Sequence, residues 1–223
     1  MIYKHNGSII TDIGGKWLTH TPPLPPLGPN TIRVKFSSGY TPTMGDSQTL
    51  VDSSNNIWDI YKESNDWTGL FVSCYNLLEV LGANTSNITD IRSMFFACRN
   101  LTKVALFDTS SVTVTSSMFT ECYALTSVPL FDTSNVKRMN YMFENCTSLR
   151  TIPLFNTSKV VSMTCMFDRC INVESGALAL YQQASTQTNP VTSHLAAFYN
   201  CGSNTVTGAA ELAQIPDDWK VRS

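Results

Sequence analysis

The chain has 223 residues and a mass of 24.7 kDa, of which 43% are hydrophobic and 14% are charged. This length and composition allow a sizeable core in one elongated domain with a smaller N-terminal part. The formal charge is −2 and lysine and arginine form no cluster, which argues against nucleic-acid binding and against an electrostatic hold on anionic membranes.

Residues 1–30 are predicted to form an N-terminal arm and a linker. Residues 1–20 contain no basic segment followed by an apolar run, so we expect neither an ordinary signal peptide nor membrane insertion. Their isoleucines and tryptophan predict a small hairpin or an extended arm, which docks either on another subunit or on the rest of this chain. An assembly partner and a homo-oligomer are therefore both open.

The segment TPPLPPLGPN at 21–30 predicts a semi-rigid polyproline II linker. Its P-x-x-P match at Pro22–Pro25 has an alternative reading as an SH3 ligand.

Residues 31–73 are predicted to form an N-terminal cap. Residues 31–40 alternate apolar and charged side chains as a half-buried strand does, and Ile57–Tyr61 alternates again. Residues 66–74 supply an incomplete first copy of the repeat that follows. We expect this cap to close the otherwise open apolar end of the repeats.

A 24-residue repeat fills residues 74–170, in which each cysteine follows a phenylalanine by three residues. A fixed period of this size is typical of stacked repeat architectures. The phenylalanines and cysteines are Phe71, Phe95, Phe119, Phe143 and Phe167, and Cys74, Cys98, Cys122, Cys146 and Cys170.

Each repeat is predicted to contain a short strand, a turn and a short helix. Within each repeat the apolar residues after the cysteine are first three residues apart and then two apart, which is the spacing of side chains on one face of a strand. We therefore expect these residues, including Leu106, Leu130 and Leu154, to face the core. Asn84, Asp108, Asp132 and Asn156 then predict Asx turns, each with a serine two residues later. A second apolar set has helical or 3₁₀ spacing and includes Val136, Met139, Met142 and Phe143.

The segment from Leu125 to Cys146 resembles the BspA-type leucine-rich repeat, in the variant also seen in mycoplasma surface lipoproteins. The resemblance implies an α/β solenoid, a right-handed leucine-rich-repeat array of about five such units, and a role in surface attachment or protein binding without catalysis. The arm, the linker and the absence of an export signal are similar to phage-encoded versions of this repeat, because virion proteins reach the exterior by lysis.

Residues 171–223 are predicted to form an irregular last repeat and a C-terminal cap. The interval from Cys170 to Cys201 is 31 residues, seven longer than the repeat. The sequence ALALYQQA at 177–184 predicts a helix, and Leu212, Ile215 and Trp219 are expected to cover the last coil.

A ladder of buried free thiols is predicted from the cysteines, because side chains that run parallel into a core oppose disulfide geometry. The ladder is Cys74, Cys98, Cys122, Cys146, Cys170 and Cys201, with Cys165 off it as a partly exposed thiol. Zinc is the alternative, but no C-x-x-C pair is present, so we predict no metal site.

No catalytic residues and no cofactor are predicted. His5, His20 and His194 lack metal-ligand spacing and are expected on the surface. Asp108 and Asp132 share a column with asparagines, which favours turn formation over acid/base catalysis. Weak calcium binding by these Asx and Ser oxygens is left open.

A binding face is predicted on the strand side, where outward positions change chemistry from coil to coil. Its candidate residues are Glu79, Lys103, Ser127, Thr151, Ala105, Pro129 and Pro153. The alternative is that the residues at these solvent-facing positions vary without any role in binding.

Two function classes follow. In the first, the protein is a recognition module that binds a protein or glycan of a host through the repeat face. Such a protein would lie on a virion or on the extracellular surface. If it is phage-encoded, it would stay in the cytoplasm until lysis. In the second, the protein is a structural decoration or spacer of a larger assembly and has no ligand of its own.

Overall fold

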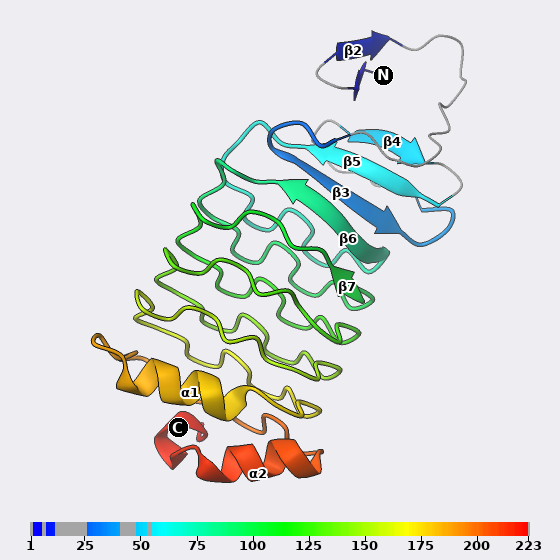
Figure 1. The fold of residues 1–223 in the computed structure, drawn as a ribbon. Helices are drawn as coiled ribbons and strands as arrows, with labels where there is room; N and C mark the ends of the chain where they lie inside the picture. The colour runs from blue at the N-terminus through cyan, green and yellow to red at the C-terminus, as the bar shows by residue number, and fades with distance from the viewer. Residues whose placement is uncertain (1, 6–7, 12–25, 41–47, 53–54, 223) are drawn as a thin grey trace.

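The computed structural model describes residues 2–5, 8–11, 26–40, 48–52 and 55–222, and it shows a stack of coils closed at its two ends by different elements (Figure 1). The N-terminal end carries a five-stranded sheet, and the C-terminal end carries two helices. The SH3-ligand motif and His20 lie outside the described residues.

The strands are concentrated at the N-terminal end. β1 (Ile2–His5) and β2 (Ser8–Thr11) form an antiparallel hairpin. The five-stranded sheet has the order β4-β5-β3-β6-β7 and is mixed, since only β6 and β7 pair in parallel. Its strands are β3 (Thr31–Phe36), β4 (Gln48–Asp52), β5 (Ile57–Tyr61), β6 (Leu77–Asn84) and β7 (Lys103–Val104).

The predicted α/β solenoid of strand–turn–helix units is wrong. Among the described residues the helices are α1 (Ala177–Thr186), α2 (Val206–Gln214) and the 3₁₀ helix η1 (Asp217–Trp219), and all three follow the regular repeats. The structure is a mixed sheet followed by coils of turns and isolated parallel bridges. The helix expected at 177–184 is confirmed as α1.

Backbone hydrogen bonds between coils replace the expected short helices. In one coil the N–H groups of Ser117, Phe119 and Glu121 donate to carbonyls 23 residues later, at 2.8 to 2.9 Å. A helix would use these N–H groups within its own segment. Ser117 and Glu121 have φ of 57° and 59°, and equivalent left-handed residues recur through the stack. A regular helix cannot contain them, since left-handed residues break its right-handed path.

The expected strands are also missing from the later coils, and proline explains part of this. Ala105 N–H donates to the Val80 carbonyl at 2.8 Å and so extends the β6–β7 ladder. Pro129 and Pro153 occupy the equivalent positions and have no N–H to donate. Beyond β7, this side of the stack keeps isolated contacts such as the Thr151–Ser175 bridge.

The assignment of Leu106, Leu130 and Leu154 to the core is wrong. These side chains are 62%, 59% and 50% exposed, and the phenylalanine after each of them is buried instead. Phe131 N–H donates to the Pro129 carbonyl at 3.0 Å, and the same turn recurs after Pro153. A three-residue turn of this kind places its central residue at the apex, so the leucine points outward.

A continuous column of phenylalanine rings forms the centre of the stack. Successive rings lie 5.2 to 5.8 Å apart and within 12° of parallel, from Phe71 through Phe95, Phe119, Phe143 and Phe167 to Phe198. Trp219 follows on Phe198 at 6.2 Å and also stacks on His194 at 4.1 Å. His194 is therefore half-buried in the C-terminal cap and is not the solvated residue expected.

Removing one central ring should be costly. We expect Phe143→Ala to lower the free energy of unfolding by about 3–5 kcal/mol, because it leaves a cavity between two coils that cannot collapse independently. Chemical denaturation measures this change. The control Val161→Ala, at a side chain 52% exposed, should change it by no more than about 0.5 kcal/mol. Equal effects of the two substitutions would contradict the packing described here.

Candidate interaction face

The predicted binding residues lie on the side of the stack that continues from β6 and β7. Lys103, Ser127 and Thr151 are exposed, whereas Glu79 is half-buried and pairs with Lys35 at 3.3 Å. The other predicted positions, Ala105, Pro129 and Pro153, are half-buried beside them. We call this side of the coils the interaction face.

A stripe of leucines runs beside these residues and is the feature that sequence reasoning missed. The leucine stripe consists of Leu106, Leu130 and Leu154, one from each of three successive coils. Each sits directly before a buried phenylalanine, and two consecutive residues of extended backbone cannot both face the core. The Leu-Phe pairs were the available signal, but they did not show which member faces inward.

Elements of this chain close both ends of the leucine stripe. At the N-terminal end the repeat has Gly82, and a methyl group placed on that glycine would lie 3.5 Å from Leu27 Cδ1. Asn84 Nδ2 also donates to the Leu27 carbonyl at 3.3 Å. At the C-terminal end the equivalent residue is Leu178, which is half-buried at the start of α1. The open part of the column is therefore the leucine stripe alone.

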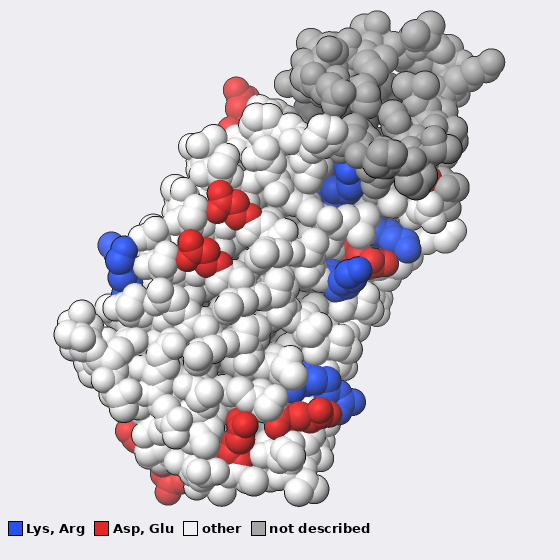
Figure 2. All heavy atoms as spheres, in the orientation of Figure 1, with Lys and Arg blue, Asp and Glu red and all other residues white. Residues whose placement is uncertain are grey.

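Charged groups are sparse on this surface. The face of the stack that is turned toward the viewer in Figure 2 is mostly uncharged, with scattered lysine, arginine and acidic residues. Asp108 and Asp132, which follow Leu106 and Leu130 by two residues, are exposed. Each accepts a hydrogen bond at 2.9 Å, Asp108 from the backbone N–H of Ser110 and Asp132 from that of Ser134. Hydrogen bonds from the hydroxyl and the backbone N–H of these serines lower the pKa of both carboxyls, so the carboxyls are ionised at neutral pH.

The predicted Asx turns are therefore present at Asp108 and Asp132, whereas Asn84 ends β6 and its side chain donates to the Leu27 carbonyl. Asn156 accepts from the Ser158 N–H at 2.9 Å in the same way. The buried threonine after each Asx donates across the stack, as Thr109 does to the Asp132 carbonyl at 2.8 Å. The described residues contain no group of three His, Cys, Asp or Glu side chains arranged to hold a metal ion.

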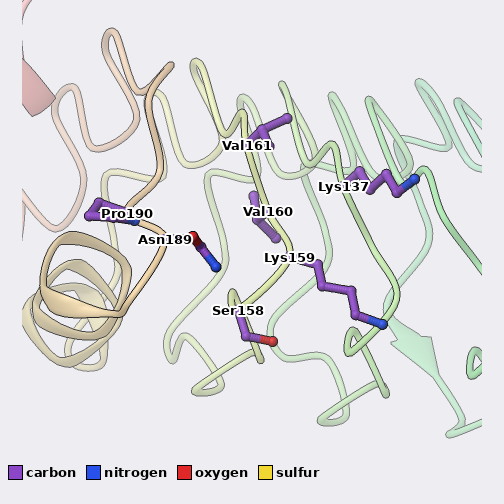
Figure 3. Close-up of a pocket in the computed structure, with 7 residues that line it drawn as sticks. All are labelled: Lys137, Ser158, Lys159, Val160, Val161, Asn189 and Pro190. Carbon is purple, nitrogen blue, oxygen red and sulfur yellow. The ribbon is translucent and has the colours of Figure 1, made fainter.

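A shallow hollow of about 400 Å³ lies where residues 189 and 190 pass the coil that contains Val160 and Val161. Figure 3 shows that the ammonium groups of Lys137 and Lys159 point away from Asn189 and Pro190. Lys159 Nζ donates to Asn135 Oδ1 at 2.6 Å, toward the preceding coil. The hollow thus has no convergent polar groups of the kind that fix a small ligand.

The cysteines form a column of free thiols. Cys98, Cys122, Cys146, Cys170 and Cys201 are buried, and Cys74 is half-buried. Four of these thiols donate to a phenylalanine carbonyl of the preceding coil at 2.9 to 3.2 Å: Cys98, Cys122, Cys146 and Cys170. Burial raises the pKa of all four, which keeps them protonated and unreactive.

A polar cluster surrounds the carboxylate of Asp168. Asp168 has no exposed side-chain surface, and Arg222 donates to its Oδ2 through Nη2 and through Nε at 2.8 Å. Arg222 also contacts Glu144 Oε1 at 3.4 Å. Burial and the neighbouring Asp168 raise the pKa of Glu144. This cluster anchors the C-terminal segment to two coils.

A family model described as "Mycoplasma protein of unknown function, DUF285" matches residues 65–179. The chain belongs to this family. The DUF285 family is associated with BspA-like repeat proteins, so the resemblance read from the sequence is supported at the level of the family. No curated protein and no solved structure matches the chain. The matched range contains the whole leucine stripe.

Within the described part of this DUF285 protein, no helix is long and apolar enough to cross a membrane.

Cys165 should react slowly with alkylating reagents. Burial, followed by the nearby Asp168 and Glu144, raises the pKa of its thiol to about 11. At pH of about 8 the thiolate fraction, and hence the alkylation rate, should be roughly two orders of magnitude below that of an unperturbed cysteine. Mass spectrometry after iodoacetamide treatment measures this rate, with Cys165→Ser to assign the site. A rate equal to that of a free thiol would contradict the burial described.

Arg222→Ala should destabilise the protein by about 2 kcal/mol, because the buried Asp168 carboxylate then keeps only the more distant Arg169, whose Nε lies 3.9 Å from Oδ1. Arg222 also lowers the pKa of Glu144, so its removal raises that pKa further. A raised carboxyl pKa contributes stability that is present below the unfolded pKa of about 4.3 and lost as pH rises through the folded pKa.

The loss from Arg222→Ala should therefore be larger at pH of about 7.5 than at about 4.5. Urea denaturation at the two pH values measures it. Lys220→Ala is the matched control, because Lys220 pairs at 3.1 Å with Asp217, whose side chain is 90% exposed. If the loss of unfolding free energy is the same at both pH values, Arg222 does not stabilise the ionised form of Glu144.

Proposed function

We propose that this DUF285 protein is a non-enzymatic recognition and attachment module that binds a host protein or glycan through the interaction face. The leucine stripe supports the proposal most strongly. Monomeric proteins seldom align exposed apolar side chains in a contiguous patch unless the patch binds something. Three leucines at half or more of their full exposure, repeated coil after coil, meet that description.

The surroundings of the stripe favour a protein over a glycan as the ligand. Burying leucine side chains is favourable only against another apolar surface, and protein side chains provide one more readily than sugar hydroxyls do. The neighbouring columns carry Ser127, Thr151 and Lys103, which suit the polar rim of a protein interface.

A virion location and a phage-encoded origin are part of this proposal, and they rest on the resemblance read from the sequence. Display on a cell surface is the other location compatible with attachment. Assembly through the N-terminal arm also stays a prediction. The hairpin β1–β2 is described, but residues 12–25, which include the first half of the linker, lie outside the described residues.

Substitutions on the interaction face should abolish attachment without unfolding the protein. We expect Leu130→Glu, and separately the triple variant Lys103→Glu, Ser127→Glu and Thr151→Glu, to reduce binding of the labelled protein to host cells by about tenfold or more. Flow cytometry on bacterial and on animal epithelial cells measures this binding. Val161→Glu is the control, because that side chain is 52% exposed, against 59% for Leu130, but lies outside the interaction face.

If wild type and both variants bind cells alike, the attachment proposal is wrong, and a structural decoration or spacer becomes the better description. Thermal melting of each variant shows whether the fold is retained.

A further inference from the structure

We propose that the leucine stripe binds an amphipathic α-helix of a partner protein, laid along the stack with its apolar side chains against Leu106, Leu130 and Leu154. This inference rests on the proposed attachment function and names the class of partner. Three observations support it: the spacing of the coils, the way the stripe ends, and the charges beside it.

The spacing of the coils matches the pitch of a helix. The rings of Phe107 and Phe131, each directly after a stripe leucine, have centroids 5.0 Å apart. The central rings of the same coils lie 5.4 Å apart. One turn of α-helix rises about 5.4 Å, so side chains at i, i+3 or i+4, and i+7 advance one coil per turn.

An extended peptide fits this spacing poorly. Side chains on one face of a strand repeat every 6.6–6.8 Å or so, and two such steps would overshoot two coils by roughly 3 Å. The leucine stripe can therefore stay in register with a helix over its whole length, but not with a strand lying along it.

Elements of this chain occupy the positions directly before and after the stripe. Leu27 covers Gly82 at one end, and α1 begins at the other with Leu178 packed against the core. Apolar side chains from outside the regular coils thus already occupy the positions before and after the stripe. The open length is three coils, which a helix of two to three turns would cover.

The charged residues beside the stripe indicate which charges the partner helix carries. Asp108 and Asp132 lie on the flank that leads to the Asx turns, and both are exposed. The opposite flank carries Lys103, Ser127 and Thr151, and the cation next to Thr151, Arg150, is paired with Glu174 at 3.1 Å. The complementary helix has leucine-like residues on its apolar face and lysine or arginine on the flank that faces the two aspartates.

The test uses two synthetic peptides of about 18 residues with the same composition. In the helical peptide, leucines recur at i, i+4 and i+7 and lysines follow one flank. In the control peptide, leucines and lysines alternate with a period of two. Fluorescence anisotropy with the full chain measures the dissociation constants.

We expect the helical peptide to bind at least about tenfold more tightly than the alternating peptide. Leu130→Glu should weaken that binding by about tenfold or more, whereas Val161→Glu should leave it unchanged. Leu130→Ser provides a second variant without added charge. The proposal is overturned if neither peptide binds, if both bind equally, or if Leu130→Glu and Val161→Glu behave alike.

Native mass distinguishes a further outcome. If the wild-type chain is a dimer that Leu130→Glu converts to a monomer, the stripe is covered by a second copy and the helix proposal falls. Loss of cell binding in Leu130→Glu without any peptide binding would keep the attachment function and reject the helical partner. Peptide binding together with unchanged cell binding in the face variants would reject the attachment function and keep the helix site.

Discussion

The hydrogen bonds that join one coil to the next on the turn side are the constraint on which the rest of the structure depends. N–H groups at alternate positions point to the following coil, as those of Ser117 and Phe119 do. This arrangement requires left-handed residues such as Tyr141 and Asn145, with φ of 58° and 60°. Each of them is strained alone, and the bonds on both sides of the coil compensate for that strain. Stacking therefore determines the local backbone conformation.

The core and the interaction face both follow from this stacking. Coils held at one spacing bring equivalent side chains into contact, so phenylalanine rings stack on phenylalanine, and a thiol such as that of Cys146 reaches a carbonyl of the coil before it. The same spacing aligns whatever points outward. Where Pro129 and Pro153 interrupt the strand-side hydrogen bonds, a tight turn exposes the next leucine, and repetition converts a single exposed side chain into a stripe.

A stack of this kind has two unlike ends, and the chain closes them differently. At the N-terminal end, β3 pairs with β6 and continues the strand side as a sheet. At the C-terminal end, Trp219 covers the last phenylalanine ring, and Phe198 N–H donates to the Trp219 carbonyl at 3.0 Å. Arg222 then fixes the last described segment to Asp168. Without such closures, an apolar surface and unpaired backbone groups would be exposed at each end.

The sequence by itself determined the repeat, its 24-residue register, the Asx turns and α1, because each depends on residue type and spacing within a short segment. The same local signals predicted a helix at Met139–Phe143 and an inward Leu130, and both are wrong. Only the tertiary structure decided these two features. The segment is not a helix because the N–H groups of Tyr141 and Phe143 bond to a neighbouring coil. Phe131 faces inward in place of Leu130 because its ring packs against Phe107 of the preceding coil. The residue spacing within one repeat cannot predict contacts with residues that lie a full coil away.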